Sequence, residues 1–174
     1  THLSNVNVEG ATIKAISIAR KLKKKTVLDI DFRPNLWGLS DHNDGENRYI
    51  KSSEVTKKLQ KNLRLFDLIV GTEEEFHIAG GINHTIKALK NVRSLTEAVL
   101  VCKRGPYGAS IFENTIKSNL EKGITGRNFK IEVFNVLGAG DGFMAGLLRG
   151  WLKNKNWETC LDFANACGLS LIHI

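Results

Sequence analysis

The chain has 174 residues, of which 42% are hydrophobic and 25% charged, and its formal net charge is +7. This length and composition suit one globular domain of ordinary size, and no apolar run is long enough to span a membrane. The lysines gather at the ends and outer faces of expected helices, away from any aromatic-rich platform, so we expect no nucleic-acid partner. Three cysteines without a C-x-x-C pair, and no signal sequence, predict reduced thiols and a cytoplasmic location.

Hydrophobic periodicity predicts alternating helices and strands along the chain. In chain order the expected elements are a helix over residues 8–25, a strand over 26–30, a loop over 31–49, a helix over 52–64, a strand over 66–71, helices over 72–80 and 84–93, strands over 98–105, 108–114 and 129–136, and helices over 139–153 and 157–171. This alternation predicts an α/β fold with a mainly parallel sheet.

Four unusual segments lie next to the expected strand ends. They are DFRP after the first strand, GTEEE after the second, KRGPYG after the third and GAGD before the long helix that begins at residue 139. In parallel sheets, ligands bind beyond the carboxyl ends of the strands. We therefore expect these segments to contribute to one site.

The segment LGAGDGF offers an anion site and an acid together. The N–H groups that begin a helix bind anions, and Gly138 and Gly140 let the backbone approach a ligand without a Cβ clash. Asp141 would lie in the first helical turn, where a carboxylate can take a proton from a hydroxyl that attacks phosphorus. An ordinary strand-to-helix turn that happens to begin with an acid is the alternative. The P-loop motif is absent, and Phe143 occupies the last glycine position of the dinucleotide fingerprint.

The longer segment NVLGAGDGFMAGL resembles the C-terminal signature of the ribokinase-like (PfkB) carbohydrate kinases. The resemblance implies a three-layer α/β/α fold with a mainly parallel sheet. It also implies an anion hole formed by the backbone of Gly138, Ala139 and Gly140. Asp141 would be the base that contacts the sugar substrate and activates its hydroxyl group.

Three further segments are similar to the nucleotide-side motifs of that family, in the family's order. GTEEEF resembles its N-x-x-E element, which implies that Glu75 organises Mg²⁺ through water. KRGPYG resembles its T-x-G-x-x-G loop, and FANACG resembles the helix near the adenine. The residues that the resemblance assigns to ATP are Thr72, Lys103, Gly105, Gly108 and Asn165. Thr72 stands where the family has Asn, and Lys103 stands where it has Thr, although a lysine can meet phosphate oxygens as a point charge.

The substrate is suggested by DIDFRPNLWG, VGTEEEF and VCKRGPYGAS, which together are similar to the 5-dehydro-2-deoxygluconate kinases of inositol catabolism. Those enzymes phosphorylate a keto sugar acid with ATP, and 2-keto-3-deoxygluconate kinases are the alternative. Arg33 follows a buried strand, precedes Pro34 and could bind a carboxylate through its guanidinium fork. A structural ion pair of Arg33 with Asp31 or Asp29 is the other interpretation.

The ends of the chain predict an incomplete domain. The first residue is Thr1, and the resemblance extends only to about Gly168, so we expect residues 1–174 to be the C-terminal portion of one PfkB-type domain, truncated at both ends. The missing parts would include the lid, through which any homo-oligomer would form, and a C-terminal segment that helps to hold the adenine and a monovalent cation. The alternative to an enzyme is an inactive fragment that only binds a nucleotide.

Overall fold

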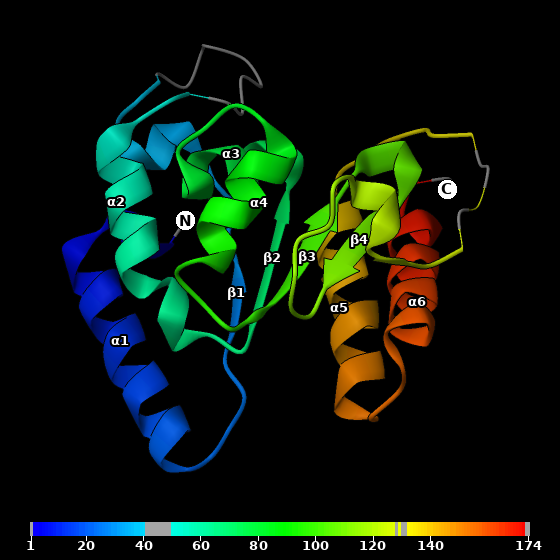
Figure 1. Cartoon of the computed structure of the whole chain (residues 1–174), viewed down its shortest axis with the longest axis horizontal. Coiled ribbons are helices and arrows are strands. Elements are labelled where there is room, and N and C mark those ends of the chain that lie inside the picture. The colour runs from blue at the N-terminus through cyan, green and yellow to red at the C-terminus, as the bar shows by residue number, and fades with distance from the viewer. Residues whose placement is uncertain (1, 41–49, 128, 130–131, 173–174) are drawn as a thin grey trace. The chain divides into compact units, whose positions relative to one another are not determined.

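The computed structural model describes residues 2–40, 50–127, 129 and 132–172. The chain divides into two compact units, Thr1–Cys102 with Phe112–Ser118, and Lys103–Ile111 with Asn119–Ile174. Helices and strands alternate along the chain, as the sequence predicts for an α/β fold (Figure 1). Within the described ranges, no helix combines the length and the apolar character that crossing a membrane requires.

The first unit combines a parallel strand arrangement with several helices. Its elements are α1 (Val6–Lys21), β1 (Val27–Asp29), α2 (Ser53–Asn62), β2 (Leu68–Thr72), α3 (Glu73–Gly80), α4 (Thr85–Arg93) and most of β3 (Val99–Lys103). β1 runs parallel to β2, with Val27 opposite Leu68, and β3 follows β2 in the strand order. Fully buried apolar side chains from the strands and helices, such as Leu68, Phe76 and Leu89, form the core of this unit.

Local capping explains where the helices of this unit begin. The side chain of Asn5 accepts hydrogen bonds from the N–H groups of Asn7 and Val8, so α1 starts two residues before the periodicity predicts. Ser52 caps α2 in the same way, so this helix begins one residue after the predicted start. The long loop after β1 contains a 3₁₀ turn over Pro34–Trp37, and its residues 41–49 lie outside the described part.

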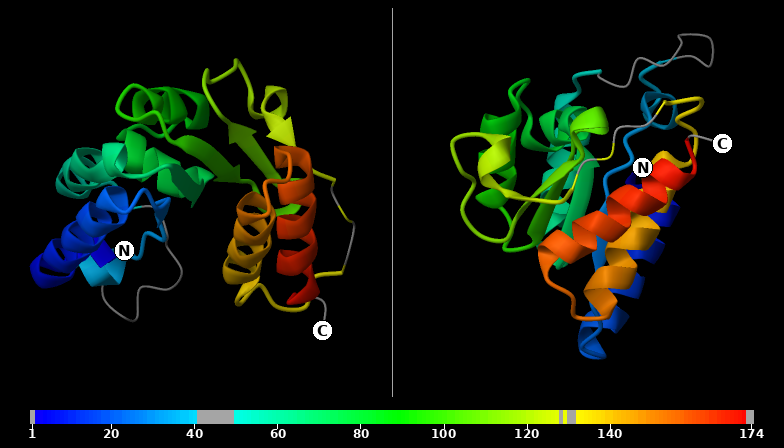
Figure 2. Two further views of the ribbon diagram at one scale, coloured as in Figure 1. Left: turned by 90° about the horizontal axis from the view of Figure 1, so that it is seen from below. Right: turned by 90° about the vertical axis from the view of Figure 1, so that its right-hand side faces the viewer.

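The second unit contains an antiparallel strand pair and two long helices. Its elements are most of β4 (Ala109–Phe112), β5 (Ile124–Thr125), α5 (Ala139–Leu152) and α6 (Trp157–Ser170), with 3₁₀ turns over Gly105–Tyr107 and Leu120–Lys122. Ser110 lies opposite Thr125 in the antiparallel pair. The short strand β5 was not predicted from the sequence. The helices α5 and α6 lie side by side along their lengths (Figure 2).

Three glycines spaced by four residues allow α5 and α6 to approach closely. A Cβ on Gly142 would lie 2.9 Å from the carbonyl oxygen of Cys167, and one on Gly150 would lie 2.9 Å from the Cα of Cys160. A Cβ on Gly146 would overlap the carbonyl oxygen of Phe163. Glycine at these positions therefore serves helix packing, which is a separate role from that of the glycines before Asp141.

The predicted strand over residues 129–136 is not formed in its described part, residues 129 and 132–136. The alternating pattern suggested a strand with one buried face, but Val133, Phe134 and Val136 are all more than half exposed. The N–H groups of Phe134 and Asn135 donate instead to the carbonyl oxygen of Ile172, at 2.8 and 3.3 Å. Alternation alone therefore misled the prediction, because a strand also needs a partner edge.

Candidate functional site

The start of α5 has the geometry of an anion site. Gly138 is the N-cap residue and has a φ of +81°, a left-handed conformation that favours glycine. The N–H group of Ala139 donates to the carbonyl oxygen of Val136 at 3.3 Å, and that of Gly142 closes the first helical turn onto Gly138 at 2.9 Å. The first-turn N–H groups of an α-helix have no intrahelical partner, and the positive end of the helix dipole favours an anion beside them.

Asp141 lies in this first turn and is exposed. The sequence predicted its place in the first turn of this helix. A carboxylate there is favoured by the helix dipole and can accept a proton from a group that reaches it from solvent. Its assignment as a catalytic base stays a prediction.

The side chain of Lys103 reaches the same helix end. A Cβ placed on Gly140 would lie 3.9 Å from Lys103 Nζ, so the ammonium group lies directly beside the first turn of α5. Lys103 is the last residue of β3 and is half-buried, and both residues belong to the second unit. An ammonium group and a helix N-terminus are both positive, so together they attract an anion more strongly than either does alone.

The loop after Lys103 is a tight turn built on two glycines. Gly105 has a φ of +54° and Gly108 a φ of +74°. The N–H group of Arg104 donates to the carbonyl oxygen of Gly108 at 2.7 Å, and Gly108 donates back to Gly105 at 3.0 Å. No heavy atom lies within 4 Å of a Cβ built on Gly105. These glycines are thus required by the turn itself, and their assignment to the nucleotide stays a prediction.

Asn165 is buried in α6 and anchors a neighbouring segment. Its Nδ2 donates to the carbonyl oxygen of Arg127 at 2.8 Å, and only 7% of the residue is exposed. Asp162, one helical turn earlier, accepts from the backbone N–H of Arg127 at 2.7 Å and from its Nε at 2.8 Å. The structure therefore gives Asn165 a structural task, and its role beside a purine stays a prediction.

In the first unit, Thr72 and Glu75 form a capping box at the start of α3. The N–H of Glu75 donates to Thr72 Oγ1 at 3.2 Å, and the N–H of Thr72 donates to Glu75 Oε2 at 2.7 Å. The other carboxylate oxygen, Oε1, accepts from the N–H of Phe32 at 3.0 Å. Glu75 therefore joins α3 to the segment that follows β1, a link that no local pattern in the sequence indicates.

Arg33 pairs with Asp31 in that segment. Arg33 Nε donates to Asp31 Oδ1 at 3.1 Å, and the two side chains are 64% and 44% exposed. The ion pair that we considered as an alternative is therefore formed. This contact uses the Nε atom of Arg33. A carboxylate ligand can also be bound by the two terminal nitrogens of a guanidinium group.

The sequence also missed a hydrogen-bonded chain between α3 and α4. Thr85 Oγ1 donates to Glu73 Oε2 at 2.7 Å and therefore accepts from His77 Nε2 at 2.9 Å. Burial is the main reason that the pKa of His77 lies below its ordinary value, although the charges of Glu74 and Glu73 act in the opposite direction. Glu73 thus takes part in a hydrogen-bonded link between α3 and α4.

The residues fit a magnesium site of the type that uses one carboxylate. Across residues 2–40, 50–127, 129 and 132–172, no group of three or more His, Cys, Asp or Glu side chains is arranged to hold a metal ion. Mg²⁺ is usually held by one or two carboxylates, with waters and substrate phosphates as the other ligands. Glu75, whose carboxylate is oriented by two backbone N–H groups, fits that requirement.

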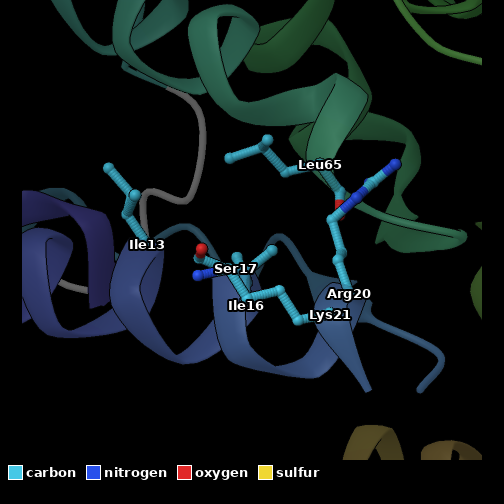
Figure 3. Close-up of a pocket in the computed structure, with 6 residues that line it drawn as sticks. All are labelled: Ile13, Ile16, Ser17, Arg20, Lys21 and Leu65. Carbon is cyan, nitrogen blue, oxygen red and sulfur yellow. The ribbon is translucent and has the colours of Figure 1, made fainter. Parts of the chain in front are cut away.

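A separate apolar pocket of about 450 Å³ lies between α1 and the 3₁₀ turn over Leu63–Leu65 (Figure 3). It is lined by Ile13, Ile16, Ser17, Arg20, Lys21 and Leu65. Arg20 crosses it to donate to the carbonyl oxygen of Leu65 at 3.0 Å. None of the predicted site residues lines this pocket.

The chain was compared with protein families, with curated proteins and with solved structures, and each comparison found matches. Residues 35–172 match the family described as pfkB family carbohydrate kinase. The 5-dehydro-2-deoxygluconokinase of Bacillus licheniformis is 24% identical over 170 residues, which cover 95% of this chain and 46% of that protein. That of Lacticaseibacillus casei is 27% identical over 185 residues, which cover 99% of this chain and 48% of that protein. The chain therefore spans about half the length of the curated relatives it matches.

Solved structures show the fold. A putative ribokinase II from E. coli, in complex with ATP and Mg²⁺, superposes with a TM-score of 0.76 at 19% identity, covering 99% of this chain and 50% of that one. At this identity the likeness supports the fold and not the activity. The prediction of a ribokinase-like α/β fold with a mainly parallel sheet is confirmed.

Proposed function

The chain belongs to the pfkB family of carbohydrate kinases, and on that premise we propose that the protein transfers a phosphoryl group from ATP to a hydroxyl group of a sugar acid. The observation that carries this proposal is the start of α5. A left-handed Gly138, an exposed Asp141 and the ammonium group of Lys103 occur there together. Positive groups that surround an acid suit a reaction in which a phosphate must be held while a proton is removed.

In the proposed reaction, Asp141 accepts the proton of the sugar hydroxyl. The hydroxyl oxygen forms a bond to the γ-phosphorus of ATP, the bond from that phosphorus to the bridging oxygen breaks, and ADP leaves with the electron pair. The backbone of residues 138–140 would stabilise the charge on the migrating phosphoryl group. The N–H of Ala139 would exchange its 3.3 Å bond to the carbonyl oxygen of Val136 for a bond to that group. Lys103 adds a point charge beside Gly140.

The nucleotide and the metal are assigned to residues by the family resemblance. Thr72, Gly105, Gly108 and Asn165 are proposed to contact the nucleotide together with Lys103. Bound Mg²⁺ would neutralise charge on the ATP phosphates, and Glu75 would orient it through water. The E. coli relative was solved with ATP and Mg²⁺, which supports this choice of cofactors. A monovalent cation and association into homo-oligomers remain predictions from the family resemblance.

For the substrate we propose 5-dehydro-2-deoxy-D-gluconate, converted to its 6-phosphate in inositol catabolism in the cytoplasm. The two bacterial relatives described above are named for that activity, and their sequences are 24% and 27% identical to this chain. Arg33, exposed next to a strand end, supports a substrate with a carboxylate. The alternative substrate within the family is 2-keto-3-deoxygluconate.

The test is ADP release by the protein expressed from its intact reading frame, with ATP, Mg²⁺ and a panel of sugar acids and neutral sugars. We expect release with the proposed acid, and we expect Asp141→Asn to reduce kcat by about 10²–10⁴-fold, as loss of a general base usually does, while ATP still binds. Glu158→Gln is the matched control, because Glu158 occupies the first turn of α6. Near-normal turnover of Asp141→Asn would exclude Asp141 as the base.

A second candidate function is nucleotide binding without catalysis. It is favoured by one observation, namely that the chain spans about half the length of its relatives. We propose that residues 1–174 form part of a single kinase domain, and a part can retain the nucleotide side alone. ATP binding by calorimetry, with no ADP release from any sugar, would support this candidate over the kinase.

A further inference from the structure

We propose that Glu75 is a positioning residue for the sugar acid, acting through the backbone of Phe32 on the Asp31–Arg33 pair. The inference rests on the proposed function, because it takes Arg33 to be the group that meets the substrate's carboxylate. Glu75 would then have two roles: it would orient Mg²⁺ through water, and it would position the residues that bind the sugar acid.

The first step is the bridge that the Glu75 carboxylate forms between two segments. Oε2 accepts from the N–H of Thr72 at 2.7 Å, at the end of β2, and Oε1 accepts from the N–H of Phe32 at 3.0 Å, just after β1. Bonds from N–H groups to a carboxylate are charge-assisted and stronger than bonds between neutral groups. One side chain on α3 thus determines where the chain lies as it leaves β1.

The second step is the conformation of Asp31. Its φ is +38°, which is uncommon for a residue other than glycine and persists only where the surrounding structure imposes it. The two neighbouring residues are both held: the N–H of Ile30 donates to the carbonyl oxygen of Val70 at 2.9 Å, and the N–H of Phe32 donates to Glu75. Releasing Phe32 would let Asp31 relax.

The third step is the consequence for Arg33. Asp31 Oδ1 accepts from Arg33 Nε at 3.1 Å, so the direction of the guanidinium depends on the conformation of Asp31. Phe32 and Pro34, on either side of Arg33, are buried and keep its backbone in place. The short segment that carries Arg33 is therefore held by two buried side chains, Phe32 and Pro34, and by the hydrogen bond to Glu75.

Packing beside the carboxylate leaves little room for another arrangement. A Cβ on Gly71 would lie 2.8 Å from Ile30 Cδ1 and 3.3 Å from Glu75 Oε2. Ile30 is 1% exposed. A side chain at Gly71 would therefore crowd both Ile30, just after β1, and the carboxylate of Glu75.

The experiment compares Glu75→Gln with Glu74→Gln in the protein expressed from its intact reading frame. The Glu75→Gln change keeps the shape of the side chain and an oxygen for one N–H group, but the amide nitrogen that it introduces cannot accept from the other. We expect the KM for the sugar acid to rise about 10-fold, since a bond to a charged group is lost. Glu74 is exposed in the same helical turn, so its variant should behave like the wild type.

A double-mutant cycle with Arg33→Met shows whether the effect passes through Arg33. We expect Glu75→Gln to change the sugar-acid KM by less than about 2-fold in that background, because Arg33 no longer transmits it. If Glu75→Gln instead raises the Mg²⁺ concentration for half-maximal activity and leaves the sugar-acid KM unchanged, Glu75 acts only through the metal and the proposal is wrong.

Amide hydrogen exchange without ligands separates this proposal from the proposed function. We expect the amide of Phe32 to exchange at least about 10-fold faster in Glu75→Gln than in Glu74→Gln, because its acceptor is weakened. Unchanged exchange at Phe32 would overturn the positioning role even if the kinase reaction is confirmed. Faster exchange in a protein that phosphorylates no sugar would keep the Glu75–Phe32 link and refute the kinase function, and with it the role of that link toward a substrate.

Discussion

The ammonium group of Lys103 lies beside Gly140, 3.9 Å from the point where a side chain on that glycine would begin. A cation next to the positive end of a helix is unfavourable unless an anion lies between or beside them. In the proposed function a bound phosphate would be such an anion, and the carboxylate of Asp141 belongs to the same helical turn. A methyl group on Gly140 would be in ordinary van der Waals contact with Lys103, so packing alone does not require glycine at this position.

Lys103→Met should weaken ATP binding by about 10-fold or more at low salt, since it removes one of the positive groups at this site. Isothermal titration at two salt concentrations measures the effect, which should shrink as salt screens the charge. Lys153→Met is the matched control, because Lys153 caps the opposite end of α5 and should leave ATP binding unchanged. If both variants bind ATP with the same affinity, Lys103 does not contribute to the ATP site.

Gly146→Ala should lower the free energy of unfolding by about 1–3 kcal/mol, because the added methyl group overlaps the backbone of α6 at Phe163 and overpacking has that usual cost. Gly10→Ala, in an exposed position of α1 with no atom within 4 Å of the new Cβ, should instead stabilise the protein by about 0.5–1 kcal/mol. Urea unfolding of both variants tests the contrast. A stable Gly146→Ala protein would contradict the close packing of α5 on α6.

Thr85→Val should destabilise the first unit by about 1–3 kcal/mol, because it leaves Glu73 and His77 without the hydroxyl that joins them. Ser53→Ala is a suitable control, since Ser53 is the exposed first residue of α2, as Thr85 is the first residue of α4. Thermal unfolding should separate the two variants by several degrees. If both melt like the wild type, the Thr85 link contributes nothing measurable.

The start of α5 could be predicted from the sequence because its signals are local. Glycines that break an apolar run, followed by an acid and then a helical pattern, specify both the turn at Gly138 and the place of Asp141. The predicted helix over 139–153 differs from the observed one by a single residue at its end. The helix predicted over 72–80 likewise differs from the observed α3 by a single residue at its start, where Thr72 is the cap.

The features that could not be predicted depend on residues far apart in the chain. The hydrogen bond from the N–H of Phe32 to Glu75 joins positions 43 residues apart, and it cannot be predicted from the type of either residue. The glycines at 142, 146 and 150 repeat every four residues, but only the presence of α6 explains them. The strand expected over 129–136 failed in its described part because alternation says which side chains share a face and not whether a partner strand is present.

Asp162→Asn should make the stability of the protein less sensitive to acid. The bond from the backbone N–H of Arg127 is the main reason that the pKa of Asp162 lies below its ordinary value; burial opposes this effect, and the guanidinium of Arg127 adds to it. A carboxyl whose pKa is lower in the folded state stabilises that state above its unfolded pKa of about 3.9, and the contribution is lost as the pH falls through the folded pKa.

Urea midpoints measured between pH 7 and pH 2 test this expectation. The wild type should lose more stability below about pH 4 than Asp162→Asn does, because the variant has no carboxyl to protonate at that position. Glu121→Gln, an exposed acid of the same unit, should follow the wild-type profile. Parallel profiles for the wild type and Asp162→Asn would mean that the bond to Arg127 does not persist in solution. The bond from Asn165 to the carbonyl oxygen of Arg127 would then remain as the hydrogen bond that ties this residue to α6.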